Sequence, residues 1–77
     1  MNVADYVCID AAVMLGKPTI RGTRVTVELV LRKLAEGATE TKLIQAYPQL
    51  TREAVRAAAQ YAAESIAHEE TVMAATA

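Results

Sequence analysis

Residues 16–27, with the sequence GKPTIRGTRVTV, are the part of the chain that most restricts its fold. Gly16 and Gly22 can adopt backbone angles that residues with a Cβ atom resist, and Pro18 fixes its own φ. The β-branched residues between and after the glycines favour extended structure. The stretch therefore predicts a tight loop of one fixed shape that leads directly into a helix.

Apolar residues then recur with the period of a helix face over three segments, residues 26–36, 39–46 and 51–68. Each segment opens on a threonine, whose hydroxyl can cap a helix N-terminus. Gly37 suits the position just after the first helix, and Pro48 ends the second because the residue before a proline disfavours helical angles. Three helices joined by short turns predict a helix-turn-helix-like bundle.

The third helix is expected to be the longest, and its apolar face is mostly alanine. The residues of that face are Val55, Ala58, Ala59, Ala62 and Ile66. Small side chains predict that another element packs close to the helix backbone. Residues 71–77 are small and weakly patterned, so they are expected to fray.

Short strands are expected before the helices. Residues 6–10 are aromatic and β-branched, as is typical of a strand, and residues 19–20 offer a second strand that can pair with it. Residues 11–15 are ambiguous and fit a single helical turn that ends at Gly16. The expected fold is mainly α, a single domain with a strand and turn element at residues 6–25 and a three-helix unit at residues 26–68.

A chain of 77 residues has a marginal core and needs some further means of stabilisation. Cys8 is the single cysteine, which excludes an internal disulfide, and His68 is the single histidine, so no zinc cluster is expected. Oligomerisation is then the remaining means of stabilisation. We therefore expect a homodimer in which the N-terminal strands pair across a two-fold axis, since two short strands alone make no stable sheet.

The chain carries a net charge of −1, but its charges are segregated. Residues 17–56 contain all eight basic residues and four acidic ones, a net charge of +4, whereas the flanking segments are acidic. This distribution is a modest electrostatic signal for nucleic-acid binding. No segment reaches the roughly 20 apolar residues of a membrane span. The N-terminus lacks the basic region of a signal peptide, so a cytoplasmic protein is expected.

If the third helix enters a DNA major groove, its outer polar residues are the candidates for base or phosphate contact. They are Thr51, Arg52, Arg56 and Gln60, with Lys42 of the preceding helix as a further phosphate contact. The spacing of four places Arg52, Arg56 and Gln60 on one stripe. The alternative is that this stripe is only the solvated face of an amphipathic helix.

Arg21 and Arg24 flank the second glycine of the loop and are candidates for binding the carboxylates of a partner or a phosphate backbone. The structural alternative has Arg24 paired with Glu28 or bound to loop carbonyls, a role that its planar donor set also suits. The sequence favours the structural role for Arg24 and leaves both roles open for Arg21.

No arrangement of residues indicates catalysis. The carboxylates do not show the spacing of a two-carboxylate or metal site, and Gly16 and Gly22 are too far apart for a phosphate-binding loop. Cys8 has no histidine near it in the sequence that would activate it as a nucleophile. We therefore expect a protein that is not an enzyme and needs no metal or cofactor.

The pattern Gly16-Lys17-Pro18-x-Ile20-x-Gly22-Thr23-Arg24-Val25-x-Val27 resembles the signature of a small prokaryotic family, domain of unknown function 433. Later segments, at residues 36–39, 47–51 and 58–62, resemble the rest of that family's pattern in the same order. The resemblance covers about residues 6 to 66. It implies a helix-turn-helix-like domain, and several of the family's members are antitoxins paired with PIN-like ribonuclease toxins.

The resemblance thus implies the antitoxin half of a type II toxin–antitoxin pair, whose partner is a PIN-like toxin with an acidic, metal-binding active site. A second role, repression through duplex operator DNA, would follow from the fold. The chain departs from many antitoxins because it shows no long charged tail, which directs attention to its folded surface. The alternative function is a dimeric protein-interaction module that binds no DNA.

Overall fold

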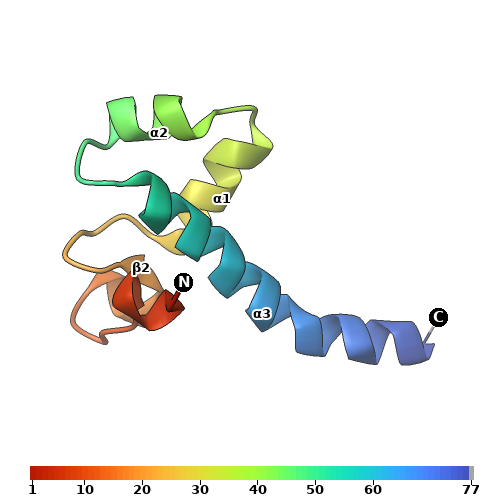
Figure 1. Cartoon of the computed structure of the whole chain (residues 1–77). Helices are drawn as coiled ribbons and strands as arrows, with labels where there is room; N and C mark the ends of the chain where they lie inside the picture. Colours follow the sequence, from red (N-terminus) through yellow and green to blue (C-terminus); the bar gives the residue numbers. More distant parts are fainter. Residues whose placement is uncertain (77) are drawn as a thin grey trace.

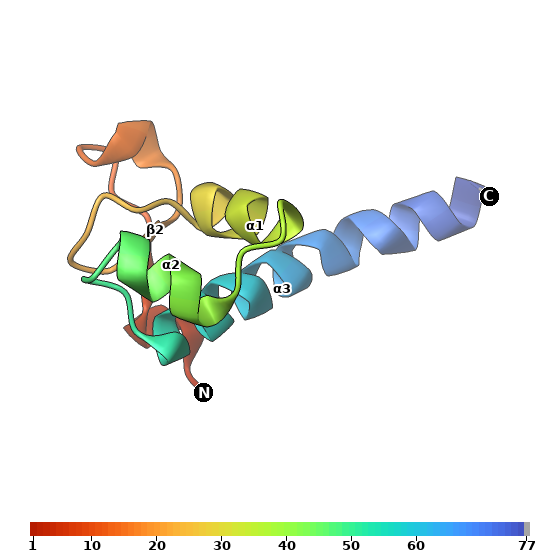
Figure 2. The same cartoon turned by 90° about the horizontal axis from the view of Figure 1, so that it is seen from above.

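The computed structural model describes the backbone of residues 1–76 and the side chains of residues 1–67. The elements in chain order are η1 (Val3–Asp5), β1 (Val7–Cys8), η2 (Met14–Gly16), β2 (Thr19–Ile20), α1 (Val27–Ala35), α2 (Glu40–Ala46) and α3 (Arg52–Thr76). The fold is mainly α with two short N-terminal strands and a three-helix, helix-turn-helix-like unit, as predicted. The other elements gather around the first half of α3, and its second half extends away from them (Figures 1 and 2).

The two strands pair antiparallel, with Val7 opposite Ile20 and Cys8 opposite Thr19, so the predicted pairing is confirmed. The outer side of β2 is also occupied, because the Ile20 N–H donates to the Val25 carbonyl at 2.8 Å. Between them, Gly22 has a φ of +79° in a turn that the Thr23 N–H closes onto the Ile20 carbonyl at 3.0 Å. Glycine adopts this angle at no steric cost, which explains its place in the loop.

The three predicted helix caps are confirmed. The hydroxyls of Thr26, Thr39 and Thr51 accept hydrogen bonds of 3.0–3.1 Å from the backbone N–H groups three residues later. At the other end of α1, the Gly37 N–H donates to the Leu34 carbonyl and the next N–H, of Ala38, donates to Lys33, both at 3.0 Å. This is a Schellman motif around a glycine with a φ of +101°.

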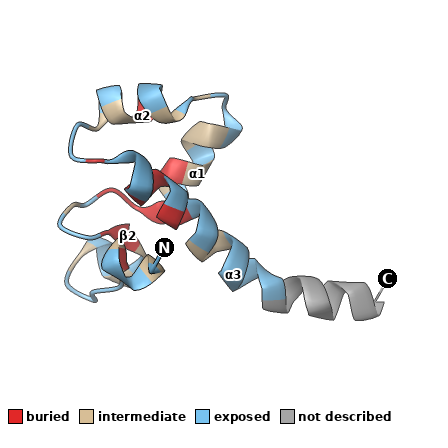
Figure 3. Cartoon of the chain, in the orientation of Figure 1, coloured by how far each residue is buried: buried red, intermediate tan, exposed pale blue. Residues whose placement is uncertain are grey.

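The core lies where the first turns of α3 meet α1, α2 and the strands (Figure 3). Its buried apolar residues are Val7, Ile20, Val25, Val27, Val30, Leu43, Leu50, Ala54, Val55, Ala57 and Ala58. Three alanines among them confirm that other elements approach the α3 backbone closely. No helix in the described part of the chain is both long and apolar enough to cross a membrane.

The apolar face of α3 is only partly buried, which differs from the prediction. Ala59 is exposed on the same side of the helix as Arg56, and Ile66 is 45% exposed because the body of the domain ends beside the middle of the helix. The helix itself continues to Thr76, past residue 70, after which fraying was expected. The prediction of a frayed tail at residues 71–77 falls on residues whose side chains lie outside the described part.

The loop before β2 also differs from the prediction. Residues 14–16 form a short turn, but Met14 and Leu15 have φ angles of +50° and +59°, in the left-handed region, where a right-handed turn was expected. For residues with a Cβ atom, this conformation costs roughly 1–2 kcal/mol per residue. The strained turn places Leu15 on the surface, where it is 95% exposed.

Candidate binding surfaces

The strained turn and Arg24 lie close together. Met14 and Arg24 line the same shallow hollow, and Leu15 follows Met14 in the chain. We call these three residues the loop surface. Within the part of the chain that the structure describes, no hydrogen-bond or ion-pair partner is found for the Arg24 guanidinium. The loop surface therefore combines an exposed apolar side chain with a cation that is free to bind an anion.

The two loop arginines have separate roles. One Arg21 Nη donates to the Ala4 carbonyl at 2.8 Å, which fastens the loop to η1. Arg24 does not form the pair with Glu28 that the sequence favoured. Both Glu28 oxygens are taken: Lys17 Nζ lies 3.2 Å from one and Arg32 Nη2 lies 2.8 Å from the other. Arg21 is thus partly engaged within the molecule, whereas no hydrogen bond or ion pair of the Arg24 guanidinium is found among the described residues.

The stripe on α3 is engaged in bonds within the molecule. Arg52 and Arg56 both bind the Glu40 carboxylate of α2, at 3.4 and 3.3 Å. Gln60 donates to Glu64 at 3.1 Å, and the Thr51 hydroxyl accepts from the Ala54 N–H as the helix cap. These residues are exposed, so DNA could reach them, but one carboxylate partly neutralises the two arginines.

Lys42 lies apart from this stripe. It follows Glu40 by two residues on α2, so the two side chains point to different sides of the helix. It borders a shallow hollow together with Lys33 and Tyr47 instead. No ion-pair partner of Lys42 is found among the described side chains. The five DNA-contact candidates therefore do not form one continuous basic face.

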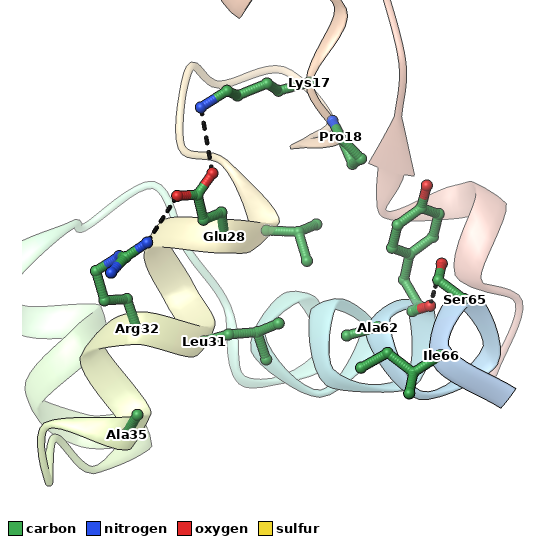
Figure 4. Close-up of a pocket in the computed structure, with 11 residues that line it drawn as sticks. Lys17, Pro18, Glu28, Leu31, Arg32, Ala35, Ala62, Ser65 and Ile66 are labelled. Atoms are coloured by element: carbon green, nitrogen blue, oxygen red, sulfur yellow. Dashed lines mark hydrogen bonds and ion pairs between the residues drawn. The ribbon is translucent and has the colours of Figure 1, made fainter. Parts of the chain in front are cut away.

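A larger groove of about 580 Å³ lies between α1 and the middle of α3. Leu31 of α1 points toward α3, where Ala62 and Ile66 face it across the groove (Figure 4). Lys17, Glu28 and Arg32 form a chain of ion pairs along one rim. The groove therefore has an apolar floor and a charged edge, a composition that suits a helix with one apolar face.

Neighbouring positive charges change the pKa of the rim carboxylate, Glu28. The hydrogen bond from Arg32, followed by that from Lys17 and by their positive charges, lowers the pKa of Glu28 below its ordinary value of 4.5. The group is exposed, so solvent screens much of this interaction. Glu28 therefore stays ionised in mildly acidic solution.

Sequence reasoning missed both the groove and the loop surface. The groove joins residues of α1 and α3 that lie about thirty positions apart, and only Ala62 and Ile66, on the predicted apolar face of the third helix, pointed to it. The left-handed turn gave no signal, because neither Met14 nor Leu15 is a glycine or asparagine. Among the described residues, no group of three or more His, Cys, Asp or Glu side chains is placed to hold a metal ion.

The fold and these surfaces define a class of small helix-turn-helix-like domains with an N-terminal strand and glycine-turn element. The profile of the family described as "Protein of unknown function (DUF433)" matches residues 7–62. The chain therefore belongs to the DUF433 family.

A crystal structure of a DUF433 member protein from Anabaena variabilis ATCC 29413 is similar to this chain, with a TM-score of 0.77 and 28% sequence identity. The similarity covers 91% of this chain and 69% of the other. No curated protein sequence shows significant similarity to the chain.

Proposed function

We propose that this protein is the antitoxin-type member of a type II pair and neutralises a PIN-like ribonuclease through the loop surface. The observation that carries the proposal is the arrangement at residues 14–24: a 95% exposed Leu15 held by a strained turn, beside an arginine without a partner among the described residues. Local strain that the surrounding structure maintains is common at binding sites. The family resemblance supports the same direction.

The proposed mechanism is occlusion. Arg24 presents a planar guanidinium that can bind a carboxylate through two parallel hydrogen bonds. A ribonuclease that holds metal ions with clustered carboxylates offers such a target. Leu15 would fill an apolar hollow beside it and exclude water, which strengthens the ion pair. The inhibitor takes no part in chemistry and needs no metal or cofactor of its own.

The test is an RNA-cleavage assay with any PIN-like nuclease that is found encoded beside the gene. Added protein is expected to abolish cleavage at a stoichiometric ratio. Arg24→Glu is expected to raise the concentration needed by about tenfold or more, the scale of losing a buried interfacial ion pair. Lys42→Glu is the matched control, since it reverses another exposed cation without a described partner. Unchanged cleavage in the presence of wild-type protein would refute the proposal.

Operator binding is a second candidate, and one observation favours it: Arg52 and Arg56 are exposed on the first turns of α3, the helix that would enter the major groove. Glu40 opposes this role because it occupies both guanidinium groups. Glu40→Gln removes that competitor and is expected to strengthen binding to a promoter duplex in a fluorescence-polarisation titration.

A matched titration at several salt concentrations separates phosphate contact from other causes, because log K falls linearly with log salt when phosphates are neutralised. Arg52→Ala/Arg56→Ala in the Glu40→Gln background is expected to abolish the gain. If neither protein binds the promoter duplex better than a scrambled one, operator binding is excluded. The function is then that of an interaction module that binds protein and no DNA.

A further inference from the structure

Part of the apolar face of α3 lies beyond the body of the domain, where Ile66 is 45% exposed. In the described part of the helix, the last fully buried residue is Ala58, Tyr61 and Ala62 are half-buried, and residues 63–67 are exposed. The backbone nevertheless remains helical, and the helix leaves the body of the domain (Figures 1 and 2). Helices in proteins owe most of their stability to packing on an amphipathic face. We therefore expect the second half of α3 to be stabilised by packing against another surface.

The groove beside it is the matching half of such a contact. Its apolar floor is formed by residues of α1 and of the middle of α3, which face each other in Figure 4. Ile66, which is 45% exposed, lies at its edge, where the packed part of α3 passes into the unpacked part. One chain thus carries both an open groove and an uncovered helix.

The charges of the two features are complementary. The rim contains Lys17 and Arg32 against one carboxylate, that of Glu28. Residues 63–77 contain three glutamates and no lysine or arginine. An acidic helix that seats beside a basic rim gains attraction and correct register, whereas two copies of either surface facing each other would repel.

We propose that the groove binds the second half of α3 from a second copy of this chain, in a two-fold dimer that exchanges the two helices. Two-fold symmetry makes the contact reciprocal: each α3 enters the partner's groove while its own groove receives the partner's helix. Both grooves and both uncovered helices are then satisfied at once. The small side chains of Ala63 and Ala67 allow the helix backbone to approach the groove floor.

This dimer differs from one formed by strand pairing. Each strand has two residues, and the outer side of β2 already bonds to residue 25, so the strands offer little free edge. A specific interface buries at least about 1,000 Å² in total. Two reciprocal helix-in-groove contacts provide a more extensive surface than two-residue strands. The inference is independent of the proposed function, because it concerns a different surface.

The test is sedimentation equilibrium of the full chain over a wide concentration range. The wild-type protein is expected to be a dimer, and Ile66→Glu is expected to raise the dimer Kd about tenfold or more, because it places a charge in the apolar contact. Ile9→Glu is the matched control: Ile9 is an exposed isoleucine (62%) outside the groove, and its substitution should leave the Kd unchanged. Circular dichroism checks that both variants fold.

A charge exchange makes the test specific for the occupant. A rim variant (Lys17→Glu and Arg32→Glu) and a helix variant (Glu69→Lys and Glu70→Lys) should each weaken the dimer, and the combined variant should restore it. A mixture of the two variants tests the same contact between different chains. The proposal is overturned if the wild type stays monomeric, if Ile66→Glu leaves the dimer intact, or if the combined variant shows no recovery.

Discussion

The helical unit at residues 26–67 and the loop at residues 9–16 differ in how well each residue type suits its backbone conformation. In the helical unit, each helix begins at a threonine cap, and the first helix ends at a glycine with the required positive φ. In the loop, two residues with bulky side chains hold left-handed angles, and a leucine stands in solvent. In the helical unit, the conformational preferences of the residues agree with the backbone angles that the fold requires. In the loop, they conflict with those angles. Such conflicts are expected where a surface serves binding.

The largest difference in the free energy of unfolding is expected between the same leucine-to-alanine substitution made in each region. Leu50 is 2% exposed in the core, so Leu50→Ala should lower the free energy of unfolding by about 2–5 kcal/mol. Leu15→Ala should change it by less than about 0.5 kcal/mol, since an exposed side chain leaves no cavity. Urea denaturation followed by circular dichroism measures both. Equal losses would break the distinction between the regions.

The caps predict a smaller effect. Thr26→Ala removes the hydroxyl that accepts from the Leu29 N–H and should cost about 1 kcal/mol of unfolding free energy. Thr26→Ser keeps that acceptor and should recover most of the loss in the same urea titration. If the serine variant is as unstable as the alanine variant, the methyl group rather than the cap stabilises this site.

Glycine should have opposite effects in the two regions. Leu15→Gly relieves a left-handed angle and should raise the free energy of unfolding by about 0.5–1 kcal/mol. Ala63→Gly, at an exposed position inside α3, should lower it by up to about 1 kcal/mol. Thermal unfolding reports both signs. A destabilised Leu15→Gly protein would show that the turn carries no strain.

The rim ion pairs predict the smallest effect, a dependence of stability on pH. The pKa of Glu28 is lower in the folded state than in the unfolded chain, so its contribution is present above the unfolded pKa and is lost as pH falls through the folded one. Glu28→Gln should therefore reduce stability slightly at neutral pH and make no difference in strong acid. A difference that grows as the pH falls would contradict this assignment.

The parts of the fold that could be predicted from sequence are those fixed by neighbouring residues. Thr39 and Gly37 mark helix boundaries through bonds to groups three to five positions away, so their roles are visible in the sequence. The β-branched residues at 19–20 likewise predicted the strand pairing. These signals act over one turn of helix or one short loop, which is the range that pattern reasoning covers.

The candidate surfaces are formed by residues that lie farther apart in the sequence. Lys17 and Glu28 are eleven positions apart, and Glu40 reaches Arg56 sixteen positions later, so their pairing follows from how the helices pack. Glu28, which sequence reasoning offered as a partner of Arg24, pairs with Lys17 and Arg32 instead. Ile66 had the correct period for a buried face, but the sequence could not show that the body of the domain ends before it.

The bond between Arg21 and the Ala4 carbonyl has a practical consequence for handling this protein. It fixes the shape of the loop from the first residues of the chain, since Arg21 donates to Ala4 at 2.8 Å. A purification tag or fusion partner joined at Met1 lies only three residues from this attachment. We expect a tag at that position to perturb the side of the molecule on which the loop is anchored. Binding studies of this protein should therefore use an untagged N-terminus.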